Sequence, residues 1–376
     1  MFRGFVVLAA AVLALMVATA SADAVPEVDA VAYALVDPST GVMLASRNAQ
    51  RELPMASTTK VMTALVTLDD GRLDRVCTVP AAAEAVGGST GSLRTGERMP
   101  VRELLTALLV PSGNDAAVTL ARCVGGGQAA FVRLMNAKAR ELGLTHTHYA
   151  NPHGLDAPGH HTTPADLISL AQVAMRDPLF RGIVASRRAS IPGPGGVGRR
   201  TYESENELLD LDPDADGIKT GMTDGAGYSL VAHARRPSLG VDLYLAMIGA
   251  PDSDTRAREA MELFDWGFAQ YARGAFLRAD ETVGSLPVDG RPGVSVPYRA
   301  ESPLTVPLRL DAGPVVERIV APAELRPPVA AGQVVGTVTL RQGDRVLGRR
   351  KLVATRSAGS PGVWDRIRDG WNAVMP

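Results

Sequence analysis

The helical pattern of this sequence stops near residue 280, and that change constrains the fold more than any other feature. Before it, apolar residues recur at steps of three and four, as at Val61, Leu65 and Leu68, which is typical of an amphipathic helix. After it, proline, valine and glycine dominate residues 287–355. A chain of 376 residues whose two parts differ in this way in pattern and composition is expected to form at least two domains.

The first of these domains, residues 25–275, is expected to have an α+β fold. Residues 30–36 and 42–46 flank a Pro- and Gly-containing turn, which predicts a β-hairpin. Further strands are expected late in the domain, at residues 217–221, 227–234 and 241–248. Helices are expected at residues 101–109, 115–123, 128–142, 164–176 and 253–268. Strands at both ends with helices between them predict an antiparallel sheet with helices around it.

Residues 280–356 are expected to form a small all-β domain that resembles a sandwich. Segments such as 334–340 and 345–353 have the composition of strands and are separated by turn residues, as in other small β domains. A short Gly- and Ser-containing linker at 357–362 follows.

The last segment, residues 360–376, is predicted to be an amphipathic helix. Its apolar residues follow one another at steps of three and four, namely Trp364, Ile367, Trp371 and Val374. The helix is too short to span a membrane, so we expect it to lie at the membrane surface, where tryptophan is favoured. Docking on the chain's own β domain is the alternative.

Residues 1–24 are predicted to be a signal peptide. Arg3 precedes an uncharged apolar run at 5–19, and small residues follow at 20–24, which is the usual order around a signal-peptidase site. An uncleaved N-terminal anchor remains the alternative. In either case the chain is exported and is expected at the extracytoplasmic face of the membrane, as a periplasmic or peripheral protein.

Composition argues against nucleic acid as a partner and leaves open whether the two cysteines form a disulfide. The chain has 39 basic and 40 acidic residues, so no basic field predicts binding to nucleic acid. Cys77 and Cys123 are its two cysteines; outside the cytoplasm they form a disulfide or remain two buried thiols. The six histidines form no H-E-x-x-H or other zinc signature, and neither a metal nor a cofactor is expected.

Ser57 and Lys60 are the first pair of candidate catalytic residues. If Ser57 begins a helix, Lys60 lies one turn later on the same face. A serine hydroxyl needs a base to become a good nucleophile, and a lysine with a lowered pKa can supply that base. The helix N-terminus also directs N–H groups toward the carbonyl under attack.

Ser112-Gly113-Asn114 forms a second motif, on the turn between two expected helices. Ser112 is placed to relay a proton between nucleophile, lysine and leaving amine. Asn114 is placed to hold a substrate amide. On its own, the motif favours a plain turn with a helix cap over a catalytic role.

Lys219-Thr220-Gly221 forms a third motif, at the end of a β-prone run. A strand there is suited to bind a peptide by β-augmentation, with Lys219 and Thr220 meeting its terminal carboxylate. Gly221 leaves room for the substrate backbone. The backbone N–H groups of Ser57 and Met222 are the expected oxyanion hole.

The three motifs occur in the order S-x-x-K, S-x-N, K-T-G, which is the serine–lysine set of β-lactamases and penicillin-binding proteins. The chain resembles the low-molecular-mass penicillin-binding proteins, and within them the D-alanyl-D-alanine carboxypeptidase family, over about residues 28–270. Beyond the motifs, the resemblance rests on residues 54–64, 103–105, 112–117, 151–155, Asp166 and 226–228.

The resemblance implies a transpeptidase-type catalytic domain followed by the β domain and the tail helix. It implies that Ser57 forms an acyl-enzyme with the penultimate D-alanine of a peptidoglycan pentapeptide and that β-lactams acylate the same serine. Lys60 would be the base, Ser112 the proton shuttle and Lys219 the carboxylate binder. Two departures stand out. Met222 follows K-T-G, and residues 204–209 resemble the family's asparagine-rich segment only partly, because Glu205 and Glu207 add negative charge there.

Three other functions use or mimic this machinery. A D,D-endopeptidase shares all of it, and a β-lactamase adds rapid deacylation, usually through a further glutamate. A non-catalytic wall-binding protein is the alternative from a different class. It predicts that one of the motifs is broken, whereas all three are intact.

Overall fold

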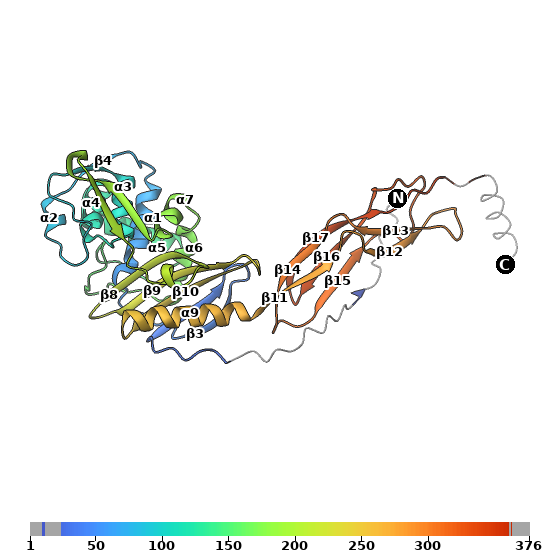
Figure 1. Cartoon of the computed structure of the whole chain (residues 1–376), viewed down its shortest axis with the longest axis horizontal. Helices are drawn as coiled ribbons and strands as arrows, with labels where there is room; N and C mark the ends of the chain where they lie inside the picture. The colour runs from blue at the N-terminus through green and yellow to red at the C-terminus, as the bar shows by residue number, and fades with distance from the viewer. Residues whose placement is uncertain (1–9, 12–23, 361, 363–376) are drawn as a thin grey trace. The chain divides into compact units, whose positions relative to one another are not determined.

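The computed structural model describes residues 10–11, 24–360 and 362, which fall into two compact units (Figure 1). The larger unit comprises residues 24–237 and 241–268, and the smaller one residues 10–11, 238–240 and 269 onward. Most of the predicted signal peptide and all but two residues of the predicted tail helix lie outside the described residues. Among the residues described, no helix is long and apolar enough to cross a membrane.

The larger unit is built on a five-stranded antiparallel sheet. Its strands, from one edge to the other, are β3 (Val42–Arg47), β2 (Ala32–Asp37), β10 (Val241–Ala250), β9 (Gly227–Arg236) and β8 (Ala215–Thr223). The first hairpin therefore pairs with the last strands of the unit, since Leu35 lies opposite Leu245. This confirms the predicted α+β fold and leaves β8 as an edge strand.

Helices cover both faces of this sheet (Figure 1). Most of them gather on one face: α1 (Lys60–Asp69), α2 (Ala81–Glu84), α3 (Val101–Leu109), α4 (Asn114–Gly125), α5 (Gln128–Glu141), α6 (Pro164–Ala174) and α7 (Pro178–Val184). Helix α9 (Ser253–Ala269) packs on the other face, where Gly267 lies close to Leu35 and Leu243. The remaining helix, α8 (Leu208–Leu211), is a single turn before β8.

Local sequence explains where several helices begin and end. The side chain of Thr163 accepts a hydrogen bond from the Asp166 backbone and so caps α6, and Asp177 caps α7 in the same way. Proline occupies the first position of both helices, where its missing N–H is not needed. Gly126 ends α4 with a φ of 76°, a conformation that glycine adopts without a steric cost.

Two small two-stranded sheets and a disulfide complete the larger unit. One sheet pairs β4 (Val76–Thr78) with β5 (Arg98–Pro100), and the other is the hairpin of β6 (Arg188–Pro192) and β7 (Arg199–Glu203). Cys77 on β4 is bonded to Cys123 on α4, with their Cα atoms 5.7 Å apart. The sequence left this pairing open because it gave no distance between the two segments.

The smaller unit is all-β, as expected. It contains a six-stranded sheet in the order β1 (Ala10–Ala11), β15 (Val315–Val320), β16 (Val334–Gln342), β17 (Arg345–Ala354), β13 (Ser295–Ala300) and β12 (Thr282–Pro287). A two-stranded sheet of β11 (Tyr271–Leu277) and β14 (Leu304–Arg309) accompanies it. Alternate residues such as Val338, Leu340 and Leu352 are buried in a core separate from that of the larger unit.

Candidate active site

Ser57 lies on a 3₁₀ turn, Ala56–Thr59 (η1), and Lys60 begins helix α1 directly after it. From the sequence we expected Ser57 to begin the α-helix itself. In a 3₁₀ turn the side chains at i and i+3 are eclipsed, which brings Lys60 Nζ to 2.6 Å from Ser57 Oγ. The candidate nucleophile and its candidate base are therefore in direct contact.

Lys60 is fully buried, and its surroundings favour the neutral amine. Burial, followed by the positive charge of Lys219, lowers the pKa of Lys60 well below its ordinary value. Glu205 and Asp115 act in the opposite direction. The ammonium form donates a second hydrogen bond to the His153 backbone carbonyl, at 2.7 Å. A buried lysine with a lowered pKa can act as the base for a serine hydroxyl.

The Ser112-Gly113-Asn114 motif forms the tight turn between α3 and α4. Ser112 is fully buried with a φ of 60°, and its Oγ has no hydrogen-bond partner among the described residues. A Cβ on Gly113 would lie 2.6 Å from the Ala107 carbonyl oxygen, so the middle position has no room for a side chain. The turn thus presents an unpaired hydroxyl, although no hydrogen bond joins it to Ser57 or Lys60.

The side-chain amide of Asn114 uses its nitrogen in a hydrogen bond but not its oxygen. Its Nδ2 donates to the Gly87 carbonyl at 2.8 Å, whereas its buried Oδ1 has no partner in the described part of the chain. Next to it, Asp115 accepts hydrogen bonds from Thr90 Oγ1 and from the Gly91 and Leu93 backbones. Asn114 Oδ1 is therefore available to a substrate N–H group, on a turn braced by Asp115.

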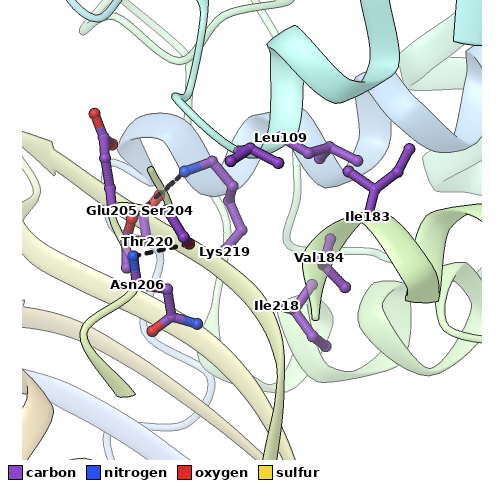
Figure 2. Close-up of a pocket in the computed structure, with 10 residues that line it drawn as sticks. Leu109, Ile183, Val184, Ser204, Glu205, Asn206, Ile218, Lys219 and Thr220 are labelled. Atoms are coloured by element: carbon purple, nitrogen blue, oxygen red, sulfur yellow. Dashed lines mark hydrogen bonds between the residues drawn. The ribbon is translucent and has the colours of Figure 1, made fainter. Parts of the chain in front are cut away.

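Lys219 and Thr220 lie on the edge strand β8. Figure 2 shows the Lys219 side chain between the polar segment 204–206 and apolar side chains that include Leu109 and Ile218. Lys219 Nζ donates to the Thr220 carbonyl oxygen at 3.0 Å. Burial lowers the pKa of Lys219 to about 8, while Glu205 has a raising effect.

Gly221 brings β8 against Ser57. A Cβ on Gly221 would lie 2.8 Å from the Ser57 backbone nitrogen, so only glycine permits this approach. Ser57, Thr220, Gly221 and Met222 line one cavity, of about 700 Å³ including space open to solvent. Met222 is largely exposed at this cavity.

Other residues of this cavity were not found from the sequence motifs. Ser89, Tyr228, Ser253 and Arg256 line it, together with Glu205 and Glu207, which the sequence marked only as departures. Arg256 is buried on α9, where its guanidinium forms an ion pair with Glu207. A basic residue at a buried position of an amphipathic helix was the only signal in the sequence. No cluster of His, Cys, Asp or Glu within the described ranges could hold a metal ion.

The geometry of this site defines a class of enzyme. A buried lysine contacts a serine on a helix-initiating turn, and a K-T-G strand closes on the same serine. These are the parts of a serine–lysine acyl-transfer enzyme.

Comparison with known proteins gives the family. A model described as D-alanyl-D-alanine carboxypeptidase matches residues 17–252, and one described as penicillin-binding protein 5, C-terminal domain, matches residues 272–359. The chain belongs to the D-alanyl-D-alanine carboxypeptidase family of low-molecular-mass penicillin-binding proteins.

Relatives of this chain are found in several bacteria. It is 33% identical to D-alanyl-D-alanine carboxypeptidase DacD of Salmonella typhimurium, over 92% of this chain and 90% of the relative. It is 37% identical to carboxypeptidase DacB2 of Mycobacterium tuberculosis, over 70% of this chain and 88% of the relative. The crystal structure of penicillin binding protein 5 from Haemophilus influenzae matches with a TM-score of 0.64 at 27% identity, covering 89% of this chain and 99% of that one.

Proposed function

We propose that this chain, a serine-type D-alanyl-D-alanine carboxypeptidase by family, removes the terminal D-alanine of peptidoglycan pentapeptides with Ser57 as its nucleophile. The observation that carries this assignment is the 2.6 Å contact between Ser57 Oγ and Lys60 Nζ, beside a cavity that also contains Thr220 and Gly221. A buried amine with a lowered pKa is the base that such a serine requires.

Acylation begins when the neutral amine of Lys60 accepts the Ser57 proton and Oγ attacks the carbonyl carbon of the penultimate D-alanine. Negative charge then develops on the carbonyl oxygen, and the backbone N–H groups of Ser57 and Met222 stabilise it. The C–N bond breaks as the leaving amine takes up a proton, which Ser112 relays from Lys60. The free D-alanine departs, and the substrate is left as an ester on Ser57.

The substrate is held by β8 and by the α3–α4 turn. As the last strand of its sheet, β8 offers an unpaired edge for an extended peptide, and Asn114 Oδ1 accepts an N–H group from it. Lys219 and Thr220 bind the terminal carboxylate, with Arg256 as a second nearby cation. Glu207 already holds Arg256, so the carboxylate must share that guanidinium.

Water completes the cycle by attacking the ester, with Lys60 again as base. A β-lactam carries a reactive amide that Ser57 opens in the same way. Its leaving group remains attached to the acyl moiety, so the acyl-enzyme persists and the protein behaves as a penicillin-binding protein.

The decisive experiment measures D-alanine release from a pentapeptide that ends in D-Ala-D-Ala, with Ser57→Ala as the inactive control. Release by the wild type alone supports the proposal, and its absence would favour a wall-binding protein. Sustained hydrolysis of nitrocefin within seconds would instead indicate a β-lactamase. Cleavage of a cross-linked dimer faster than of the pentapeptide would indicate an endopeptidase.

We further propose that residues 25–275 carry catalysis and that residues 280–356 form the accompanying β-sandwich-like domain. Export by residues 1–24 and peripheral attachment by residues 360–376 would place the enzyme at the outer face of the cytoplasmic membrane. The support for this location is the composition of the two segments and the cell-wall chemistry of the substrate.

A further inference from the structure

We infer that His160 is a positioning residue that orients and polarises the peptide unit between Ala56 and Ser57, through Thr59. The inference rests on the proposed function, because that peptide unit supplies the Ser57 N–H assigned to the oxyanion hole. His160 belongs to none of the three motifs, and its side chain is only 4% exposed.

A chain of hydrogen bonds leads from His160 to the nucleophile turn. The Ala150 backbone N–H donates to His160 Nδ1 at 3.0 Å. Because that nitrogen accepts, the neutral ring carries its proton on Nε2, which lies 2.8 Å from Thr59 Oγ1. The Thr59 hydroxyl, receiving this bond, donates its own proton to the Ala56 carbonyl oxygen, also at 2.8 Å. All three hydrogen bonds therefore run from donor to acceptor in the same direction, from Ala150 toward Ala56.

The last acceptor in this chain is the other end of the catalytic amide. The Ala56 carbonyl and the Ser57 N–H belong to one planar peptide unit. A hydrogen bond to the carbonyl oxygen polarises the amide, and successive bonds in a chain strengthen one another. The Ser57 N–H therefore becomes a stronger donor toward the oxyanion than an isolated amide would be.

The same peptide unit is held in an unusual conformation. Ala56 has a φ of 48°, a left-handed conformation that a side chain disfavours. Glycines flank the unit, since a Cβ on Gly154 would lie 2.1 Å from the Ala56 oxygen and one on Gly221 would lie 2.8 Å from the Ser57 nitrogen. Packing thus confines the unit, and the Thr59 bond fixes its orientation within that space.

The protonation state of His160 fits this role. Burial lowers the pKa of His160 to about 4, so the ring is neutral near pH 7 and keeps the tautomer that the chain requires. Thr59 is fully buried as well, so water does not compete for its hydroxyl.

The test uses two residues of the chain and a matched control. His160→Ala and Thr59→Val each remove one link, whereas His160→Gln and Thr59→Ser retain a donor at the same place. The control is His161→Gln, because the neighbouring His161 faces Glu52 rather than Thr59. For each variant kcat and KM on a D-Ala-D-Ala peptide, the acylation rate with a chromogenic β-lactam and the melting temperature are measured.

We expect kcat and the acylation rate to fall about tenfold in His160→Ala and Thr59→Val, less than the loss on removing an oxyanion donor outright. KM should stay within about twofold, because substrate binding does not use these links. Thr59→Ser and His160→Gln should recover most of the rate. The double variant should be no slower than the slower single one, because both changes break one chain.

The inference is overturned if both disruptive variants keep kcat within about twofold of wild type while only their melting temperatures fall. Equal losses in Thr59→Val and Thr59→Ser would overturn it too, and this pair decides the question if His160→Ala does not fold. Failure of the proposed function is a separate result. In that case the wild type itself releases no D-alanine and is not acylated.

Discussion

Arg200 and Glu97 form a bidentate ion pair in the larger unit, with N–O distances of 2.6 and 2.7 Å. Their side chains are only 12% and 5% exposed, and they join the β6–β7 hairpin to the segment before β5. On the same hairpin, the Tyr202 hydroxyl donates to the Gly91 carbonyl. The ion pair therefore supports the loop that Asp115 anchors beside the Ser112-Gly113-Asn114 turn.

Replacing Arg200 by leucine should destabilise the protein by about 3–5 kcal/mol, because the Glu97 carboxylate is left buried without its partner. Urea denaturation at neutral pH measures the change. The control is Arg188→Leu, which breaks an ion pair on the same hairpin whose two side chains are 69% and 71% exposed and should cost less than about 1 kcal/mol. Equal effects of the two substitutions would show that the buried ion pair contributes no more to the free energy of unfolding than the exposed one.

Substrate affinity should weaken as the pH rises above about 8. Burial lowers the pKa of Lys219 to about 8, and only the protonated amine attracts the substrate carboxylate. KM should therefore be constant below that pH and rise above it, by up to about tenfold per pH unit. A pH profile of kcat/KM and kcat separates this effect from the chemistry of Lys60.

Glu205→Gln should move the rise in KM to lower pH. The Glu205 carboxylate acts to raise the pKa of Lys219, so its removal makes the amine lose its proton earlier. Glu203→Gln, two residues away and paired with Arg188, is the control and should leave the profile in place. A Glu205→Gln profile that coincides with wild type would show that Glu205 does not raise the pKa of Lys219.

Stability should fall as the pH drops from about 6.5 to about 4. Burial lowers the pKa of both His153 and His160 to about 4, whereas unfolded histidines titrate near 6.5. In that interval the unfolded state binds more protons, so each histidine favours unfolding progressively, by up to about 3 kcal/mol.

Urea midpoints of wild type and His160→Gln at pH 7 and pH 4.5 measure this effect. The variant should lose less stability between the two pH values than the wild type does. The exposed His146→Gln should behave like the wild type. An identical loss in His160→Gln would show that His160 is protonated with little cost in the folded state.

Reducing the Cys77–Cys123 bond should lower the free energy of unfolding by about 2–4 kcal/mol. The bond closes a loop with a sequence separation of 46, and its removal gives the unfolded chain more conformations. Cys77→Ser/Cys123→Ser, compared with the wild type under oxidising conditions, measures the difference in urea. An unchanged midpoint would mean that the bond constrains the unfolded chain little.

Deleting residues 360–376 should move the protein from the membrane to the soluble fraction while D-alanine release from a soluble peptide stays the same. The reason is that the predicted tail carries an apolar stripe with two of the protein's three tryptophans. Fractionation of cells that express the mature enzyme checks this. An unchanged membrane fraction would rule out the tail as the attachment site.

Patterns local in the sequence were enough to predict most of the secondary structure. The run at 101–109 corresponds to α3 (Val101–Leu109), and that at 253–268 to α9 (Ser253–Ala269). Turn residues and period-two alternation similarly located β16 and β17. Such signals are short-range, because a helix or strand contacts its own neighbours at a fixed period.

Features that depend on distance through space were not accessible in this way. The 3₁₀ turn at Ser57 depends on Gly154 and Gly221, which approach from far along the chain. The Cys77–Cys123 bond needed the packing of β4 against α4. Arg256 enters the cavity only because α9 lies across the sheet, and a buried arginine on a helix has no motif of its own.

The two glycines that flank the Ala56–Ser57 peptide also limit how this enzyme could escape inhibition. A side chain at Gly154 or Gly221 would collide with backbone atoms of Ala56 or Ser57, so it would displace the Ser57 N–H that we propose as an oxyanion donor before it obstructed a drug. Under the proposed mechanism, the same donor serves both the natural peptide and a β-lactam. Resistance by crowding this part of the site would therefore remove the activity it was meant to preserve, and tolerated substitutions must arise farther out, where the cavity meets solvent.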